Sequence, residues 1–167
     1  MTAPQRLDRT LYCYRIGDPE GKYPIVDATG SRLYPGRWNT AAAPLVYASE
    51  SYSTAMLEKL VHGAGHLPPN QHFVCITLPR GTSYEIVTGD RVPGWAADEP
   101  VASREFGTRW VRESRSLVLF VPSYVARVER NVLLNPAHAQ YGDIETSLPE
   151  PVWWDERLFR GRTTPGG

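Results

Sequence analysis

The chain has 167 residues, of which 41% are apolar and 22% charged, and its formal net charge is zero. This length suits one domain with its own hydrophobic core, and the composition is ordinary for a globular protein. The zero net charge gives no electrostatic case for a nucleic-acid or membrane partner, and no apolar run approaches the roughly 20 residues that span a bilayer, so we expect a cytoplasmic protein.

The first part of the chain predicts two strands and one helix. Residues 1–10 form a polar arm, and "LYCYRI" (11–16) is aromatic and β-branched enough for a strand. Residues 18–35 are rich in Gly, Pro and Asp and predict a long loop, a type of segment that often has a functional role. "PLVYAS" (44–49) predicts a short strand, and a helix follows over 52–61, with Ser51 as its N-cap and Gly63 as its stop.

The second part adds four strands and one helix. The pattern predicts strands over 72–79, 82–87, 116–123 and 131–136, and a helix over 101–113. The continuous apolar run "SLVLFVPS" at 116–123 is typical of a buried central strand. Residues 160–167 lack apolar side chains and are expected to be a disordered tail. Strands and helices in no strict alternation predict an α+β fold, with one compact domain over 11–159.

The cysteines and histidines do not predict a metal site. Cys13 and Cys75 are the only cysteines, and both lie in apolar strand-like runs, so we expect buried free thiols. His62 and His66 have helical spacing, but the glycines between them argue against a helix that spans both. No histidine has a cysteine partner at zinc-finger spacing.

Glu58 is a candidate because of its place on the predicted helix. Helical spacing groups the apolar side chains on one face (Met56, Leu57, Leu60 and Val61). Glu58 falls on the shoulder of that face, from which a carboxylate reaches a cleft at the edge of the core, whereas Lys59 is expected to point to solvent. The alternative is a solvated glutamate without a role.

Two arginines are candidates for binding an anion. Arg37 lies in "GRWN", where Gly36 permits a close backbone approach, the guanidinium offers a fork of donors to a phosphate, and Trp38 shields the site from water. The alternative is a turn in which Arg37 stacks on Trp38. Arg15 interrupts an aromatic strand; if it faces inward it needs an anion, and if it faces outward it has no special role.

Four further polar residues lie near strand ends. Tyr47 closes a short strand, where its ring either stacks on a flat ligand or caps the core. Ser116 and Ser123 flank a buried strand, but no G-x-S-x-G elbow accompanies them, which argues against a serine hydrolase. Asn135 precedes a proline and is typical of a turn.

In this order, the motifs resemble a known family. They are Tyr14-Arg15, "GRWN" (36–39), "VYAS" (46–49), "AMLE" (55–58), "VPS" (121–123) and "LNPAH" (134–138). The set resembles the RES domain, named for its arginine, glutamate and serine, over about Leu11 to Phe159. Each motif alone is weak, and their order and spacing make the set specific. Pro35 stands where the family's usual "GGRW" has its first glycine, which leaves the path of this loop open.

The resemblance implies a fold similar to that of the ADP-ribosyltransferase toxins, with mixed sheets and a few flanking helices. It implies the toxin of a bacterial toxin–antitoxin pair that destroys NAD⁺, because relatives split NAD⁺ with inorganic phosphate. NAD⁺ and phosphate would be substrates, with no further cofactor. The implied partner is an Xre-like helix-turn-helix antitoxin, and a homodimer remains open. Some relatives ADP-ribosylate a protein, which is one alternative; a non-catalytic module that binds a nucleotide or another anion is a second.

The resemblance also implies roles for the candidate residues. Glu58, Arg37 and Tyr47 would be catalytic, with the Glu58 carboxylate stabilising positive charge on the ribose. Arg15 would join Arg37 on the diphosphate or on the attacking phosphate. The remaining substrate-binding candidates are Trp38, Asn135 and a serine, for which Ser116 is slightly preferred to Ser123 because Ser123 follows a proline in a turn.

Overall fold

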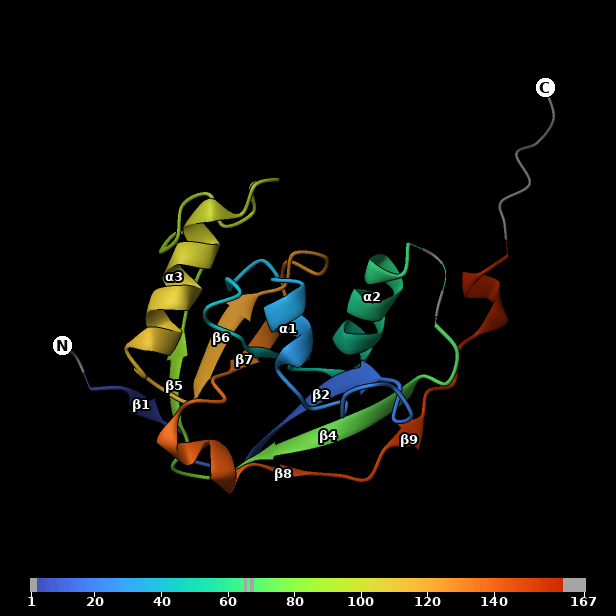
Figure 1. Ribbon diagram of the computed structural model, residues 1–167, viewed down its shortest axis with the longest axis horizontal. Helices are drawn as coiled ribbons and strands as arrows, with labels where there is room; N and C mark the ends of the chain where they lie inside the picture. The colour runs from blue at the N-terminus through green and yellow to red at the C-terminus, as the bar shows by residue number, and fades with distance from the viewer. Residues whose placement is uncertain (1–2, 65, 67, 161–167) are drawn as a thin grey trace.

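The computed structural model describes residues 3–64, 66 and 68–160, which form one nine-stranded sheet with helices packed on it (Figure 1). The strands are β1 (Gln5–Arg6), β2 (Leu11–Gly17), β3 (Val46–Ser49), β4 (His72–Leu78), β5 (Ser83–Ile86), β6 (Val118–Pro122), β7 (Arg130–Leu134), β8 (Glu145–Thr146) and β9 (Glu150–Pro151). The helices are α1 (Thr29–Leu33), α2 (Tyr52–His62) and α3 (Val101–Arg112), with 3₁₀ turns η1 (Ala139–Asp143) and η2 (Glu156–Leu158). In Figure 1 all three α-helices lie above the curved sheet.

The sheet is mixed, as expected for an α+β fold. Its strand order is β1-β5-β6-β7-β3-β2-β4-β8, and β9 also pairs with β4. Within the described part of the chain, β5 and β6 are the parallel pair, and the remaining pairs are antiparallel. Parallel neighbours need a crossover, and α3 supplies it between β5 and β6. The predicted α+β class is therefore confirmed.

Apolar side chains on both faces of β6 explain its continuous apolar sequence. Val118 and Phe120 belong to one buried cluster with the side chains of β2 and β4, whereas Leu119 and Val121 belong to a second cluster with Trp110 of α3. Because successive strand residues point to opposite faces, a strand covered on both sides has no polar face. The prediction of a buried central strand at this position is confirmed.

The pairing of β2 differs between its two sides. Against β4 it pairs along its whole length, from Leu11↔Leu78 to Gly17↔His72. Against β3 it makes a single pair, Tyr14↔Ser49. The sheet therefore opens between β2 and β3 beyond this pair, and the side chains there surround a space that continuous pairing would close.

Three expectations need correction or lie outside the described residues. The loop predicted over 18–35 contains α1, which is held by the Ser31 hydroxyl: Ser31 Oγ lies 2.7 Å from the carbonyl oxygen of Leu45 and accepts from its N–H at 2.9 Å. This tertiary contact has no signal in the local sequence. The polar arm joins the sheet through β1 and buries Leu7. The expected disordered tail lies outside the described residues, except for Arg160.

The other predicted elements occur close to their expected bounds. Cys13 is a buried free thiol, and burial raises its pKa, whereas Cys75 is free but only half-buried. Over the described residues, none of the helices is long and apolar enough to cross a bilayer.

Candidate active site

A cleft of about 300 Å³ opens where β2 and β3 part, and one face of α2 borders it. Several candidates predicted from the sequence line this cleft, together with residues that the sequence did not single out. The lining residues are Tyr14, Arg15, Ile16, Ser31, Gly36, Tyr47, Ala48, Ser49, Ala55, Glu58, Lys59, His62 and Asn131.

Helix α2 presents its more polar face to the cleft. The helix begins at the Ser51 N-cap, whose hydroxyl accepts from Thr54 N, and ends at Gly63, as predicted. Its cleft-lining residues follow helical spacing i, i+3, i+4, i+7 (Ala55, Glu58, Lys59 and His62). The predicted orientation was therefore wrong in part: Lys59 lines the cleft, and Leu57 and Val61 are exposed.

The Glu58 carboxylate has one oxygen fixed and the other free for a ligand. Its side chain is 19% exposed. Glu58 Oε1 accepts from Ser123 Oγ at 3.0 Å and from Asn131 Nδ2 at 2.6 Å. Within the described part of the chain no hydrogen bond occupies Oε2, and His62 Nδ1 lies 3.9 Å from it. The neutral donors orient the carboxylate without neutralising its charge.

Tyr47 lines the cleft, and its hydroxyl holds the Gly36–Asn39 loop. Tyr47 Oη donates to Asn39 Oδ1 at 2.7 Å and accepts from Trp38 N at 3.1 Å. Asn39 Oδ1 also accepts from Gly36 N at 2.9 Å. A Cβ on Gly36 would lie 2.7 Å from Tyr47 Oη, so the close approach expected at this glycine is present. Burial raises the pKa of Tyr47, which keeps its hydroxyl protonated as a donor.

Arg15 faces the cleft, but two of its donors bind backbone carbonyls. Nε donates to Ile25 O and Nη1 donates to Tyr47 O, so the guanidinium bridges the opening between β2 and β3. Burial lowers the pKa of Arg15, and the charge of Asp27 opposes this shift. The arginine thus faces inward without a carboxylate in ion-pair contact among the described residues.

Arg37 and Trp38, the candidates in the "GRWN" motif, do not line the cleft. Arg37 Nη1 donates to Trp95 O at 3.1 Å and to Ala97 O at 2.7 Å, and the guanidinium lies 4.0 Å from the centroid of the Tyr124 ring. It stacks on Tyr124 rather than on Trp38, and it is not among the cleft-lining side chains. Trp38 is 3% exposed and stacks on Trp95 within the core.

The structure brings Ser123, and not the preferred Ser116, to Glu58. Ser116 is buried below α3, where its hydroxyl accepts from Trp110 Nε1 at 2.9 Å and donates to Val118 O. Asn135 is also buried and serves a turn, because its side chain binds Val111 O and Ala137 N. The sequence did not single out Asn131, although β6 and β7 form a hairpin whose register, Val121↔Asn131, brings Asn131 near Ser123.

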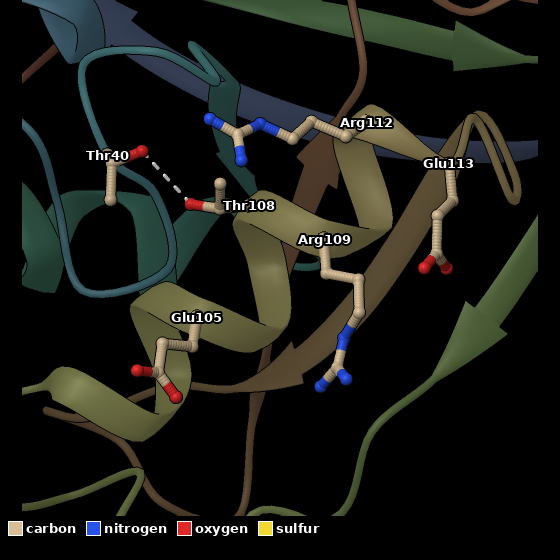
Figure 2. Close-up of a pocket in the computed structure, with 6 residues that line it drawn as sticks. All are labelled: Thr40, Glu105, Thr108, Arg109, Arg112 and Glu113. Carbon is tan, nitrogen blue, oxygen red and sulfur yellow. Dashed lines mark hydrogen bonds between the residues drawn. The ribbon is translucent and has the colours of Figure 1, made fainter.

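A larger, shallower hollow of about 560 Å³ lies on the outer side of α3 (Figure 2). It is lined by Thr40, Glu105, Thr108, Arg109, Arg112 and Glu113. The hydroxyls of Thr40 and Thr108 meet there at 3.1 Å, and the charged residues are of both signs. It holds none of the candidate residues, so we place the site in the cleft beside Glu58. The described residues contain no group of three His, Cys, Asp or Glu side chains that could hold a metal ion.

Comparison with known proteins identifies the family of this chain. The model of the family described as "RES domain" matches residues 12–155. A protein of Sphingobium sp. (strain YBL2) named Prs ADP-ribosylating toxin is 36% identical over 159 residues, covering 90% of this chain and 98% of that protein. Toxin Res of Photorhabdus laumondii subsp. laumondii is 39% identical over 111 residues, covering 65% of this chain and 70% of that protein.

The chain belongs to the RES domain family. A solved structure supports the fold: a chain in the crystal structure of the M. tuberculosis MbcT–MbcA toxin–antitoxin complex aligns with a TM-score of 0.68 at 13% identity. The alignment covers 88% of this chain and 86% of that one. The expected resemblance and the fold class are thereby both confirmed.

Proposed function

We propose that the chain is the toxin of a bacterial toxin–antitoxin pair and that it depletes NAD⁺ by cleaving the nicotinamide–ribose bond. The observation behind this proposal is the Glu58 carboxylate, held through one oxygen by Ser123 and Asn131 while the other oxygen has no hydrogen bond from the described residues. The names of the relatives, Toxin Res and Prs ADP-ribosylating toxin, support the toxin role.

Nicotinamide is a good leaving group, so catalysis depends mainly on stabilising the charge that develops on the ribose. Nicotinamide is cationic in NAD⁺, and it leaves as a neutral molecule when the electrons of the C–N bond pass to its ring nitrogen. Positive charge then develops on the ribose, as in glycoside cleavage. A preorganised carboxylate stabilises this charge, and its contribution grows in a site with little water. Glu58 Oε2 supplies this interaction, and the Tyr47 ring forms a wall for the flat nicotinamide or ribose.

Inorganic phosphate is the proposed acceptor. A phosphate oxygen attacks the ribose carbon as nicotinamide departs, giving ADP-ribose 1″-phosphate and nicotinamide. The cationic side of the cleft, formed by Arg15 and Lys59, supports an anionic acceptor. NAD⁺ and phosphate are the substrates in this scheme, and no cofactor takes part.

Omitting phosphate is expected to slow NAD⁺ consumption by the purified protein. In phosphate buffer the product should be ADP-ribose 1″-phosphate, identified by mass spectrometry, and in a phosphate-free buffer consumption should fall by at least about tenfold, because water replaces a better nucleophile held by cations. ADP-ribose released at the full rate without phosphate would instead establish hydrolysis.

The two serines provide a matched pair of variants. Ser123→Ala removes one donor from Glu58 Oε1, and a hydrogen bond to a charged group contributes about 1.5–3 kcal/mol, so NAD⁺ consumption should fall about tenfold or more. Ser116→Ala should leave kcat/KM unchanged but lower the free energy of unfolding by about 1–3 kcal/mol, because the buried Trp110 N–H loses its acceptor. Equal kinetic effects of the two changes would contradict the assignment of Ser123.

Transfer of ADP-ribose to a protein is the second candidate function. The observation in its favour is the name of the Sphingobium relative, Prs ADP-ribosylating toxin, whose alignment covers 90% of this chain. The same Glu58 chemistry applies, with a protein nucleophile in place of phosphate. Labelled NAD⁺ that marks a protein band in a lysate, and does so without phosphate, would favour this acceptor.

The proposed partner is an antitoxin of the Xre-like helix-turn-helix type. The fold neighbour was solved in a toxin–antitoxin complex, and this supports an antitoxin as partner. Co-expression with a small helix-turn-helix protein encoded beside the gene should restore growth and intracellular NAD⁺. We further propose a cytoplasmic location, where both NAD⁺ and such an antitoxin are present; a homodimer is testable by light scattering.

A further inference from the structure

Lys59 is a charged residue of the cleft that the scheme above mentions only as part of its cationic side. Lys22 and Lys59 are the only lysines of the chain. Lys22 lies in an exposed loop, 5.5 Å from the centroid of the Tyr23 ring, whereas Lys59 is half-buried and lines the cleft with Arg15. Its direction follows from helix geometry, because it shares the inner face of α2 with Glu58 and His62.

Lys59 and Arg15 place two cations in one cleft without an ion-pair partner for either. Among residues 3–64, 66 and 68–160, no carboxylate lies within salt-bridge distance of Lys59 or Arg15. Burial lowers the pKa of Lys59, the charge of Arg15 lowers it further, and Asp18 acts in the opposite direction. Two like charges that are partly removed from water raise the free energy of the empty cleft, and a bound anion relieves this cost.

The donors that remain on these side chains suit phosphate oxygens. Arg15 directs Nε and Nη1 to backbone carbonyls and keeps Nη2, which makes no hydrogen bond in the described part of the chain. Because both bonds fix its guanidinium, this donor is held in place before a ligand binds. Lys59 adds an ammonium group on a flexible stem, which acts as a point charge. A fixed guanidinium nitrogen, Arg15 Nη2, beside a mobile point charge is a suitable arrangement for a phosphate or diphosphate group.

We propose that Lys59 is a substrate-binding residue that, with Arg15, holds a phosphate group of the reaction. This inference rests on the proposed function. The shared chemistry is a phosphate oxygen, which belongs either to the diphosphate of NAD⁺ or to the inorganic phosphate acceptor. Lys59, rather than Arg37, is then the second cation of the site, because Lys59 lines the cleft and Arg37 does not.

The test compares Lys59→Gln with Lys59→Arg and with the control Lys22→Gln. We would measure the affinity for ADP-ribose, which has the diphosphate but cannot react, and the KM for inorganic phosphate at saturating NAD⁺. If Lys59 holds the diphosphate, Lys59→Gln should weaken ADP-ribose binding about tenfold or more. If it holds the acceptor, the KM for phosphate should rise by a similar factor while ADP-ribose binding stays constant.

The controls separate a specific contact from the general effect of charge. Lys59→Arg should show only a small part of the change seen in Lys59→Gln, because it keeps the cation. Lys22→Gln should change neither the affinity for ADP-ribose nor the KM for phosphate. The inference is overturned if Lys59→Gln changes neither constant, or if Lys22→Gln changes them equally. A urea unfolding curve for Lys59→Gln that matches the parent would show that the losses do not come from misfolding.

Failure of this inference differs from failure of the proposed function. If the parent consumes NAD⁺ and Lys59→Gln has the parent's ADP-ribose affinity and KM for phosphate, the proposed function is supported and the role of Lys59 is wrong. If the parent does not consume NAD⁺, direct calorimetric titration with ADP-ribose and with pyrophosphate still applies. Binding that depends on Lys59 and not on Lys22 would then support the anion site alone, and binding indifferent to both would overturn it.

Discussion

Glu58→Gln is expected to reduce NAD⁺ consumption by on the order of 100-fold or more, the usual scale for loss of a preorganised electrostatic group. The substitution isolates charge from structure because both donors bind the same oxygen, Oε1. The carbonyl oxygen of a glutamine can accept from Ser123 and Asn131 in the same way. An uncharged amide NH₂ then takes the place of Oε2 in the cleft, so the geometry is kept and the negative charge is lost.

The measurement is the initial rate of nicotinamide release, with Glu105→Gln as the control. Glu105 is an exposed glutamate on α3 in the hollow outside the cleft (Figure 2), so its substitution should leave the rate unchanged. A Glu58→Gln protein that releases nicotinamide at the parental rate would show that the carboxylate does not stabilise the ribose cation.

Gly107→Ala is expected to lower the free energy of unfolding by about 3 kcal/mol, at the upper end of the usual range for overpacking. A Cβ at this position would lie 1.8 Å from Trp38 O and 2.8 Å from Trp38 C. These are backbone atoms, so relief requires α3 to move away from the loop. The intrinsic helix propensity of alanine, better than that of glycine by up to about 1 kcal/mol, does not offset such a contact.

The change should also disturb the cleft, because α3 holds the loop that supports Tyr47. Ser103 Oγ donates to Arg37 O at 2.7 Å, and Arg104 Nε donates to Gly36 O at 3.0 Å. Urea unfolding followed by tryptophan fluorescence measures the loss, with Gly30→Ala as the control, since a Cβ at Gly30 of α1 meets nothing within 4 Å. A Gly107→Ala protein as stable as the Gly30→Ala protein would contradict this account of the packing.

The sequence predicted the long elements well and the orientation of their side chains less well. The strand at 116–123 and the Ser51–Gly63 helix have strong local signals: an apolar run, an N-cap hydroxyl and a glycine stop. The orientation of α2 has no such local signal. Apolar periodicity predicts that Leu57 and Val61 face inward, whereas the opening of the sheet gives that position to Glu58, Lys59 and His62.

The candidate site, too, could be predicted from the sequence only in part. Order along the chain was enough to select Glu58, Tyr47 and Arg15, which line one cleft. The choice between Ser116 and Ser123 depends on which strand end approaches α2, and Asn131 becomes visible only once the β6–β7 register is known. The direction of Arg37 depends on carbonyl groups about 60 residues further along the chain, which no local pattern reports.

The single pair between β2 and β3 has a mechanical consequence. It divides the sheet into one part built on β5, β6, β7 and β3 and another built on β2 and β4, joined at Tyr14↔Ser49, by the guanidinium of Arg15 and by helix α2, which contacts both β2 and β3. A substrate that contacts Arg15 on one part and the Glu58–Asn131 pair beside the other ties the two parts together. Occupancy of the cleft and cohesion of the sheet are then thermodynamically linked, so part of the substrate's affinity depends on the stiffness of this hinge.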